Sequence, residues 1–173
     1  MINRLLHIFV WLSRIHCCRG FGIQSPTDYA FVRYVINEHW QYSAYERLGR
    51  SDSWLKRKLG LLYFRLANWR QAQMVIDRVG AKEYVNAGCK HSQVVDCAEK
   101  VELAFVGIND NVKALYEHCD DRSVIVVEGI RENKRIWKAL LADSRVTISY
   151  DLFYCGILMF DSGRVKQHYK INF

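Results

Sequence analysis

Residues 101–141 read VELAFVGINDNVKALYEHCDDRSVIVVEGIRENKRIWKALL, and apolar runs alternate there with segments of helical periodicity. The runs at 103–108 and 124–130 are short, rich in β-branched residues and almost continuously apolar, as is typical of parallel strands covered on both faces. Residues 111–119 and 132–142 carry apolar side chains at helical spacing. The order strand, helix, strand, helix predicts an α/β fold with a parallel sheet.

The chain changes character after Arg145. Residues 146–152 and 169–173 alternate apolar with polar side chains, which predicts strands with one covered face. A further apolar run at 157–160 lies between them, and residues 161–164 have the composition of a turn. We therefore expect a mostly parallel sheet that ends in an antiparallel C-terminal meander.

One more strand is expected at 74–79, and the central strands of the sheet should contain Val75, Phe105 and Val126. Only residues 80–100 separate this strand from the next one. A complete sheet of this kind would place further βα units of roughly 30 residues each in that interval. The sequence therefore predicts a shortened sheet.

Residues 1–70 are expected to form a basic helical region that packs on the sheet. Ser25 can cap a helix that begins at Pro26, and Asp28 can complete the capping arrangement. Another helix is expected at 53–69, where leucines recur at helical spacing. This region carries eleven Lys and Arg against four Asp and Glu, whereas the rest of the chain carries fourteen of each. The excess could attract nucleic acid, an anionic membrane surface or an acidic partner, or it could be a solvated surface that keeps the protein soluble.

The pattern of side chains at 2–15 predicts a helix with an unusually large apolar surface. Asn3, Arg4, His7 and Arg14 fall on one narrow face, and the remainder is apolar apart from its ends. The segment is too short to span a membrane, which takes about 20 apolar residues, and no small-residue cleavage site follows it. A helix of this kind needs cover, from the body of the protein, from a second subunit or from a membrane interface. We expect it to function in association.

The cysteines favour a reduced, cytoplasmic protein. The chain has a full apolar complement and no secretory processing site, so disulfides are not needed to stabilise it. Cys89 with His91 and His118 with Cys119 offer ligand types, but not the spacing that lets two ligands converge on one zinc ion, so no metal site is expected. The six cysteines are Cys17, Cys18, Cys89, Cys97, Cys119 and Cys155.

Three segments resemble, in order, a bacterial group of class I S-adenosylmethionine-dependent methyltransferase-like proteins. They are GFGIQSP at 20–26, LLYFRLAN at 61–68 and DLFYCGILMF at 151–160. The resemblance implies a helical N-terminal region over 1–70 and a Rossmann-like, methyltransferase-type α/β domain over 71–173 that ends in an antiparallel strand pair. None of the three segments is a catalytic motif.

The chain departs from this family where the cofactor would bind. A glycine-rich turn after the first strand and an acid after the second would hold S-adenosylmethionine. Here Gly80 is the one glycine of the turn, and Asp96 or Glu99 would have to replace the acid. Glu128 is the one acid at the carboxyl end of a predicted parallel strand, so Gly80 and Glu128 are the candidate cofactor-binding residues if any cofactor binds. We expect no binding of S-adenosylmethionine at useful affinity, and no residue is identified as catalytic.

Three functions are therefore considered. The first is a catalytically degenerate methyltransferase-like domain that acts as an interaction or partner protein, through a protein partner or a homo-oligomer at the N-terminal apolar helix. The second is an active S-adenosylmethionine-dependent methyltransferase of unknown substrate with an unusual cofactor loop. The third is a module that binds nucleic acid or a membrane surface through the basic N-terminal helices, for which steep salt dependence would be diagnostic.

Overall fold

The computed structural model describes the backbone of residues 2–173 and the side chains of residues 7–17 and 20–173. The α-helices in this part of the chain are α1 (Ile2–Ser13), α2 (Pro26–Phe31), α3 (Trp54–Arg70), α4 (Lys82–Gly88), α5 (Val112–Leu115) and α6 (Lys134–Ala142). The strands are β1 (Met74–Asp77), β2 (Gln93–Val95), β3 (Val101–Gly107), β4 (Cys119–Glu128), β5 (Ile148–Asp151), β6 (Cys155–Met159) and β7 (Gln167–Lys170). Shorter helical segments cover Ile15–Gly20, Val32–Ile36, Ser43–Glu46 and Tyr116–His118.

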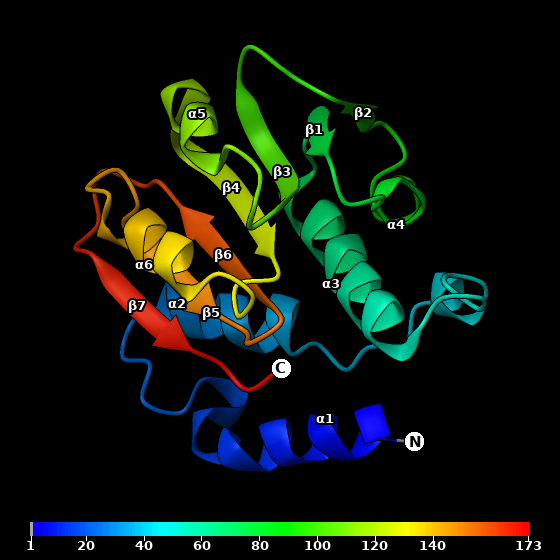
Figure 1. Cartoon of the computed structure of the whole chain (residues 1–173). Coiled ribbons are helices and arrows are strands. Elements are labelled where there is room, and N and C mark those ends of the chain that lie inside the picture. The colour runs from blue at the N-terminus through cyan, green and yellow to red at the C-terminus, as the bar shows by residue number, and fades with distance from the viewer. Residues whose placement is uncertain (1) are drawn as a thin grey trace.

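The strands form one mixed sheet in the order β2-β1-β3-β4-β6-β5-β7, with helices on both faces (Figure 1). The pairs β2 with β1, β1 with β3 and β3 with β4 are parallel. Strand β6 runs antiparallel to both of its neighbours, β4 and β5. The α/β class, the mostly parallel sheet and the antiparallel C-terminal strands are therefore as the sequence predicts.

The expected meander is wrong in its last step. Strand β7 pairs with β5, in parallel, and not with β6. The reason is that β6 lies between β4 and β5, so both of its edges are already paired. Strand β7 therefore pairs with the outer edge of β5, where it runs parallel to β5 and opposite to β6.

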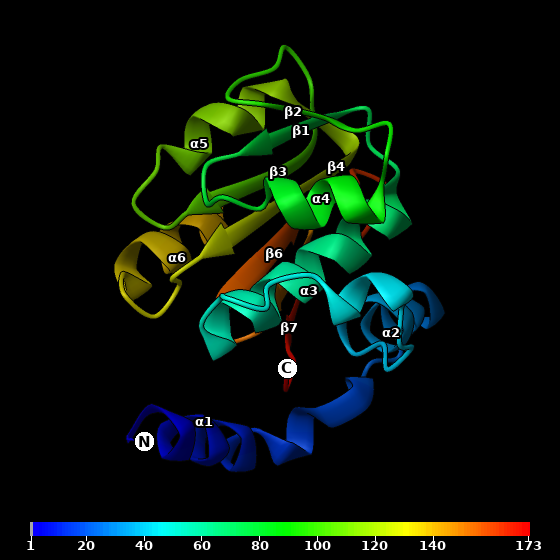
Figure 2. The same cartoon turned by 90° about the vertical axis from the view of Figure 1, so that its right-hand side faces the viewer.

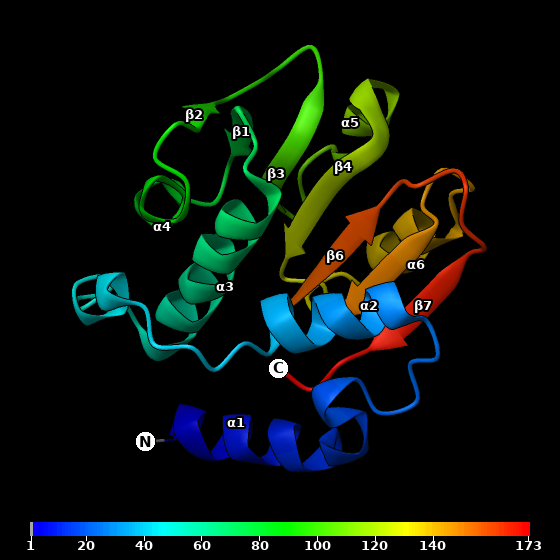
Figure 3. The ribbon, with the colours of Figure 1, turned by 180° about the vertical axis from the view of Figure 1, so that it is seen from behind.

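The continuous apolar runs are explained by the two covered faces of the sheet. On one face Leu103 and Phe105 pack in a core with the helices α2, α3 and α4. On the other face Ala104 and Val106 pack in a core with α5 and α6. Figure 3 shows α2 and α3 in front of the sheet, with α5 and α6 behind it. The helices α2 and α3 of the N-terminal region thus share one hydrophobic core with the sheet.

The predicted helix starts and central strands are confirmed. The side chain of Ser25 accepts a hydrogen bond from the backbone N–H of Asp28, and Ser53 caps α3 in the same way. Val75, Phe105 and Val126 are fully buried in β1, β3 and β4. The carboxylate of Asp28, expected to help with capping, instead points to the sheet, where Tyr150 and Tyr169 donate hydrogen bonds to it.

The C-terminus is ordered, although β7 ends at Lys170. Ile171 is 1% exposed, and its N–H donates to the carbonyl of Asp151. Helix α1 lies beyond this end of the chain, across the side of the sheet at which β4, β5 and β7 end (Figure 2). Among the described residues, no helix is both long enough and apolar enough to cross a membrane.

Candidate functional site

The carboxyl edge of the sheet is the place where open α/β sheets bind ligands. Three strands that run in the same direction end there in acids, namely β1 in Asp77, β4 in Glu128 and β5 in Asp151. Strand β6 starts at the same edge, because Cys155 pairs with Glu128 and Gly156 with Asp151. This edge is the candidate site.

Glu128, a predicted site residue, lies at this edge but is bound to another side chain. The hydroxyl of Tyr63, on α3, donates a hydrogen bond to Oε1 of Glu128. Burial raises the pKa of Glu128, and the hydrogen bond from Tyr63 opposes that rise without cancelling it. The pKa of Tyr63 is raised well above its usual value, chiefly by burial. The phenol therefore stays protonated and continues to donate to the carboxylate.

Gly80, the other predicted site residue, lies in the loop that joins β1 to α4. Its φ of +79° is in the left-handed region, which explains a glycine there. It is exposed, and a Cβ at this position would meet nothing within 4 Å. Gly80 and Glu128 follow strands that are separated by β3, and no hydrogen bond joins them in the described structure.

The interval after β1 holds more than its length predicts. A turn at Gly80, the helix α4 and the edge strand β2 all fit, because α4 has only seven residues and β2 only three. Asp96 follows β2 directly and is exposed. This interval therefore contains a turn, a crossover helix and a strand that is followed by an acid. The sheet is nevertheless shortened, because α4 and the short strand β2 are the one helix and the one strand between β1 and β3 in the described chain.

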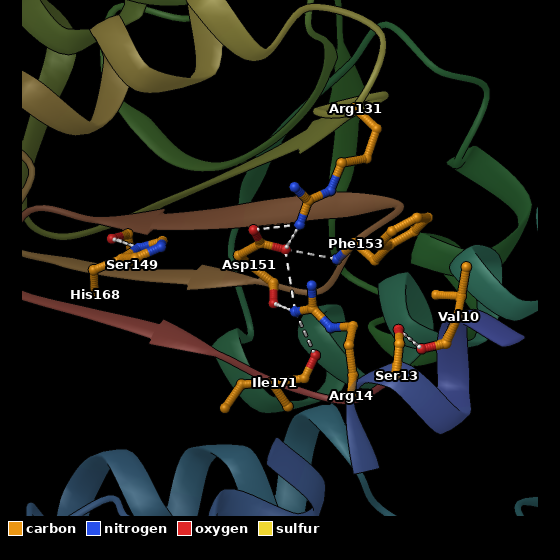
Figure 4. Close-up of polar contacts among 9 residues, drawn as sticks. All are labelled: Val10, Ser13, Arg14, Arg131, Ser149, Asp151, Phe153, His168 and Ile171. Atoms are coloured by element: carbon orange, nitrogen blue, oxygen red, sulfur yellow. Dashed lines mark hydrogen bonds and ion pairs between the residues drawn. The ribbon is translucent and has the colours of Figure 1, made fainter. Parts of the chain in front are cut away.

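Asp151 is the centre of the most extensive polar cluster at the edge (Figure 4). Its side chain is 5% exposed and lies between two guanidinium groups. Nη2 of Arg131 is 2.6 Å from Oδ2, and Nη2 of Arg14 is 3.2 Å from Oδ1. Arg14 also donates to the carbonyls of Asp151 and Ile171. Since Arg14 follows α1, this cluster fastens the N-terminal helix to the ends of β5 and β7.

Phe153 completes the cluster through its backbone and its ring. Its N–H donates to Oδ1 of Asp151, at 2.9 Å, and its φ of +76° is uncommon for a residue with a Cβ. The guanidinium of Arg131 lies 4.9 Å from the centre of its ring, and that of Arg14 lies 5.9 Å away. The Nε atoms of both arginines are buried and lack hydrogen-bond partners among the described residues.

His7 makes a second attachment of α1 to the edge. Its Nδ1 is within hydrogen-bond distance of the hydroxyl of Tyr154, in the turn between β5 and β6. Its ring stacks on Trp54, with 4.2 Å between the ring centres. Burial and the nearby Lys58 lower the pKa of His7, so the neutral ring is favoured.

The attachments of α1 use its polar face, and a large part of its apolar surface is directed outward, although Val10 and Trp11 face the body across a cavity. Phe9 is 67% exposed and Leu12 is 49% exposed, and Ile8 and Ile15 beside them are also exposed. The body of the protein therefore does not cover this face, contrary to one of the three expectations for the helix.

The sequence did not reveal the Arg14, Asp151 and Arg131 cluster. The helical periodicity of residues 2–15 places His7 and Arg14 on one face, which was the only available signal. The partners of these residues lie more than 100 positions away along the chain. Cys89 and His91 are in contact, with 3.3 Å between Sγ and Nε2, but no group of three metal-ligand residues occurs in the described structure.

Comparisons with known proteins identify no protein that is similar to this chain. No family model matches the chain, and neither a curated protein nor a solved structure is significantly similar to it.

Proposed function

We propose that this chain is a Rossmann-like, methyltransferase-type domain with a degenerate cofactor half, and that it acts as an interaction protein. One observation carries the proposal: the carboxyl edge, where a ligand of such a sheet would lie, is occupied by the chain itself. Tyr63 binds Glu128, Arg14 and Arg131 bind Asp151, and α1 lies across the strand ends.

The strand order supports the Rossmann-like part of the proposal. The chain steps from β1 to β2 on one side and then returns to β3 on the other side, which is the reversal typical of doubly wound sheets. The crossover α4 packs in the core of one face, whereas α5 and α6 pack in the core of the other. The antiparallel β6 agrees with the strand pair that the family resemblance implies.

The region that would hold a cofactor supports the degenerate part. Oδ1 of Asp77 accepts a hydrogen bond from the N–H of Val79, so this acid stabilises its own loop. The loop has a single glycine, Gly80, with open space around it. Oε1 of Glu128 already accepts a hydrogen bond from Tyr63, so this acid holds α3 to the end of β4.

The interaction surface is the outward apolar face of α1, centred on Phe9 and Leu12. Exposed apolar patches on soluble proteins are usually interaction sites. The whole excess of seven positive charges lies in residues 1–70, so two copies of this region would repel each other. The partner that fits is therefore a different protein, with an apolar groove rimmed by acidic side chains.

Titration calorimetry with S-adenosylmethionine and S-adenosylhomocysteine tests the cofactor part. We expect no dissociation constant near or below about 10 μM, a level that corresponds to roughly −7 kcal/mol. Tighter binding would support the alternative function, an active methyltransferase, which the retained order β1, Gly80, α4, β2 and Asp96 favours. Gly80 and Glu128 would then be the first residues to change.

A double substitution, Phe9→Ser with Leu12→Ser, tests the interaction part. Because both side chains are exposed, the variant should keep the melting temperature of the wild type and lose the partner in affinity capture. The matched control is Val165→Ser, which removes an 81% exposed apolar side chain at another place. Binding that survives the double substitution would refute this surface, as would a wild type that dimerises or sediments with anionic vesicles through the same two residues.

A further inference from the structure

A cavity of about 500 Å³ lies between α1 and the body of the protein. One wall consists of α1 residues, including Val10 and Trp11, and the opposite wall consists of the rings of Trp54, Tyr154 and Phe173. Its volume lies within the range of about 300–1,000 Å³ that is usual for small-molecule sites. The lining is largely apolar and aromatic, so an apolar ligand body would fit it.

Lys58 is the lysine that lines this cavity, and it forms no ion pair with the described residues. Its Nζ lies 4.5 Å from the ring centre of Phe173 and 5.2 Å from that of Trp54. No described carboxylate lies within ion-pair distance of it, whereas Lys56 on the same helix is 3.2 Å from Asp52. The two aromatic rings replace only part of the hydration that this half-buried ammonium group loses, and no carboxylate of the described residues neutralises its charge. The cavity therefore offers an unmet positive charge beside an apolar surface.

A second cavity, of about 340 Å³, continues from the first. The two share Trp11, Lys58 and Phe173, so Lys58 stands where they meet. The second cavity is also lined by Asn37, whose Nδ2 is buried and has no hydrogen-bond partner among the described residues. The two adjoining cavities are together called the groove, and they offer the ammonium group of Lys58 and the unpaired Nδ2 of Asn37 to a ligand.

We propose that this groove is a binding site for a small amphiphilic monocarboxylate. The apolar body of the ligand lies among the aromatic rings, and its carboxylate accepts hydrogen bonds from Nζ of Lys58, with Nδ2 of Asn37 as the further donor in the adjoining part. Arg65 and Glu38 also line the second cavity, but Arg65 donates to the carbonyls of Val35 and Ile36, and Glu38 accepts from Tyr42. Lys58 is therefore the cation available to a ligand among the described lining residues, and one available cation favours a monoanion over a doubly charged phosphate. The inference does not depend on the interaction proposed for α1, because Phe9 and Leu12 do not line the groove.

Calorimetric titration of the full chain with octanoate, octanol and octylammonium tests the charge preference. Octanoate should bind at least about tenfold more tightly than octanol, since a charge-assisted hydrogen bond is worth about 1.5–3 kcal/mol. Octylammonium should bind least. Indole-3-acetate, in a parallel titration, distinguishes an aromatic acid from an acyl acid as the preferred body.

Lys58→Met removes the charge and keeps an apolar side chain of similar reach. It should reduce the affinity for octanoate about tenfold or more and leave that for octanol unchanged. Lys56→Met is the control, because this side chain lies on the same helix and pairs with Asp52, and it should change neither. Lys58→Gln provides a second neutral variant if the methionine variant melts below the wild type. Equal affinity for octanoate and octanol, or full octanoate affinity in both Lys58 variants, would overturn the proposal.

Discussion

Asp28 should contribute more to stability than any surface acid, because it joins the N-terminal helices to the far edge of the sheet. Its side chain is 1% exposed. The guanidinium of Arg164 donates to both of its oxygens, Tyr150 donates to Oδ1 at 2.8 Å, and Tyr169 donates to Oδ2 at 2.9 Å. These partners come from β5, from β7 and from the turn before β7, so one carboxylate holds three segments to α2.

Asp28→Ala leaves Arg164 and two buried hydroxyls without their acceptor. Removal of one partner from a buried ion pair costs about 3–5 kcal/mol. For a chain of this length, about 2–4 °C of melting temperature are lost per kcal/mol, so the melting temperature should fall by about 6–20 °C. Urea unfolding followed by circular dichroism measures the free energy directly. Asp96→Ala, at an exposed acid, is the control and should stay within about 0.5 kcal/mol of the wild type.

The pH dependence gives an independent check on the charge. Burial opposes ionisation of Asp28, but the hydrogen bonds from Arg164, Tyr150 and Tyr169 bring its pKa below the ordinary value. Because the pKa of Asp28 is lower in the folded state, its carboxylate stabilises the fold at every pH above the pKa of the unfolded state, about 3.9. This contribution is lost as the pH falls through the pKa of the folded state. The stability difference between wild type and Asp28→Asn should therefore be constant from about pH 7 to pH 5 and should shrink below about pH 4. A cost of Asp28→Ala under about 1 kcal/mol, or a difference that does not change with pH, would refute this reasoning.

One deletion and two substitutions probe the core and the carboxyl edge. Deletion of residues 169–173 should cost several kcal/mol in urea unfolding, since each buried large apolar side chain is worth roughly 1.5–3 kcal/mol; an unchanged melting temperature would contradict this. Gly156→Ala should destabilise by about 1–3 kcal/mol, because its Cβ would lie 2.2 Å from the ring of Trp137; a stability equal to the wild type would mean that the ring can move aside. Tyr63→Phe should lower the free energy of unfolding by about 1–3 kcal/mol and raise the pKa of Glu128 further, because the carboxylate loses its hydrogen-bond donor. Carboxyl titration by nuclear magnetic resonance measures that pKa, and a lower pKa in the variant would exclude the hydrogen bond.

The sheet could be predicted from the sequence because its central strands are covered on both faces. The runs around Phe105 and Val126 need apolar side chains at nearly every position, and the continuity of those runs identifies them. The pairing of β7 could not be predicted in the same way. Alternation around Tyr169 predicts a strand with one covered face, but it does not identify the neighbouring strand. That neighbour is fixed by the insertion of β6 between β4 and β5, which is a property of the whole sheet.

At the candidate site, the orientation of α1 could not be predicted from the sequence either. Its sequence gives one narrow polar face and one broad apolar face, and burial of apolar surface favours the broad face inward. In the structure the narrow polar face points inward, because Asp151 binds Arg14 and Tyr154 binds His7. These protein partners take the place of the water that would otherwise bind the two side chains.

These attachments have two consequences at the carboxyl edge. The polar face of α1 is attached to the end of β5 and to the turn that follows it, and the side chains of Tyr63, Arg14 and Arg131 already bind the acids that end β4 and β5. The apolar face is left outside, available to another molecule. The acids at the expected ligand site thus bind side chains of the same chain, whereas apolar side chains of α1 lie exposed beside that site, and this arrangement is the reason for proposing association.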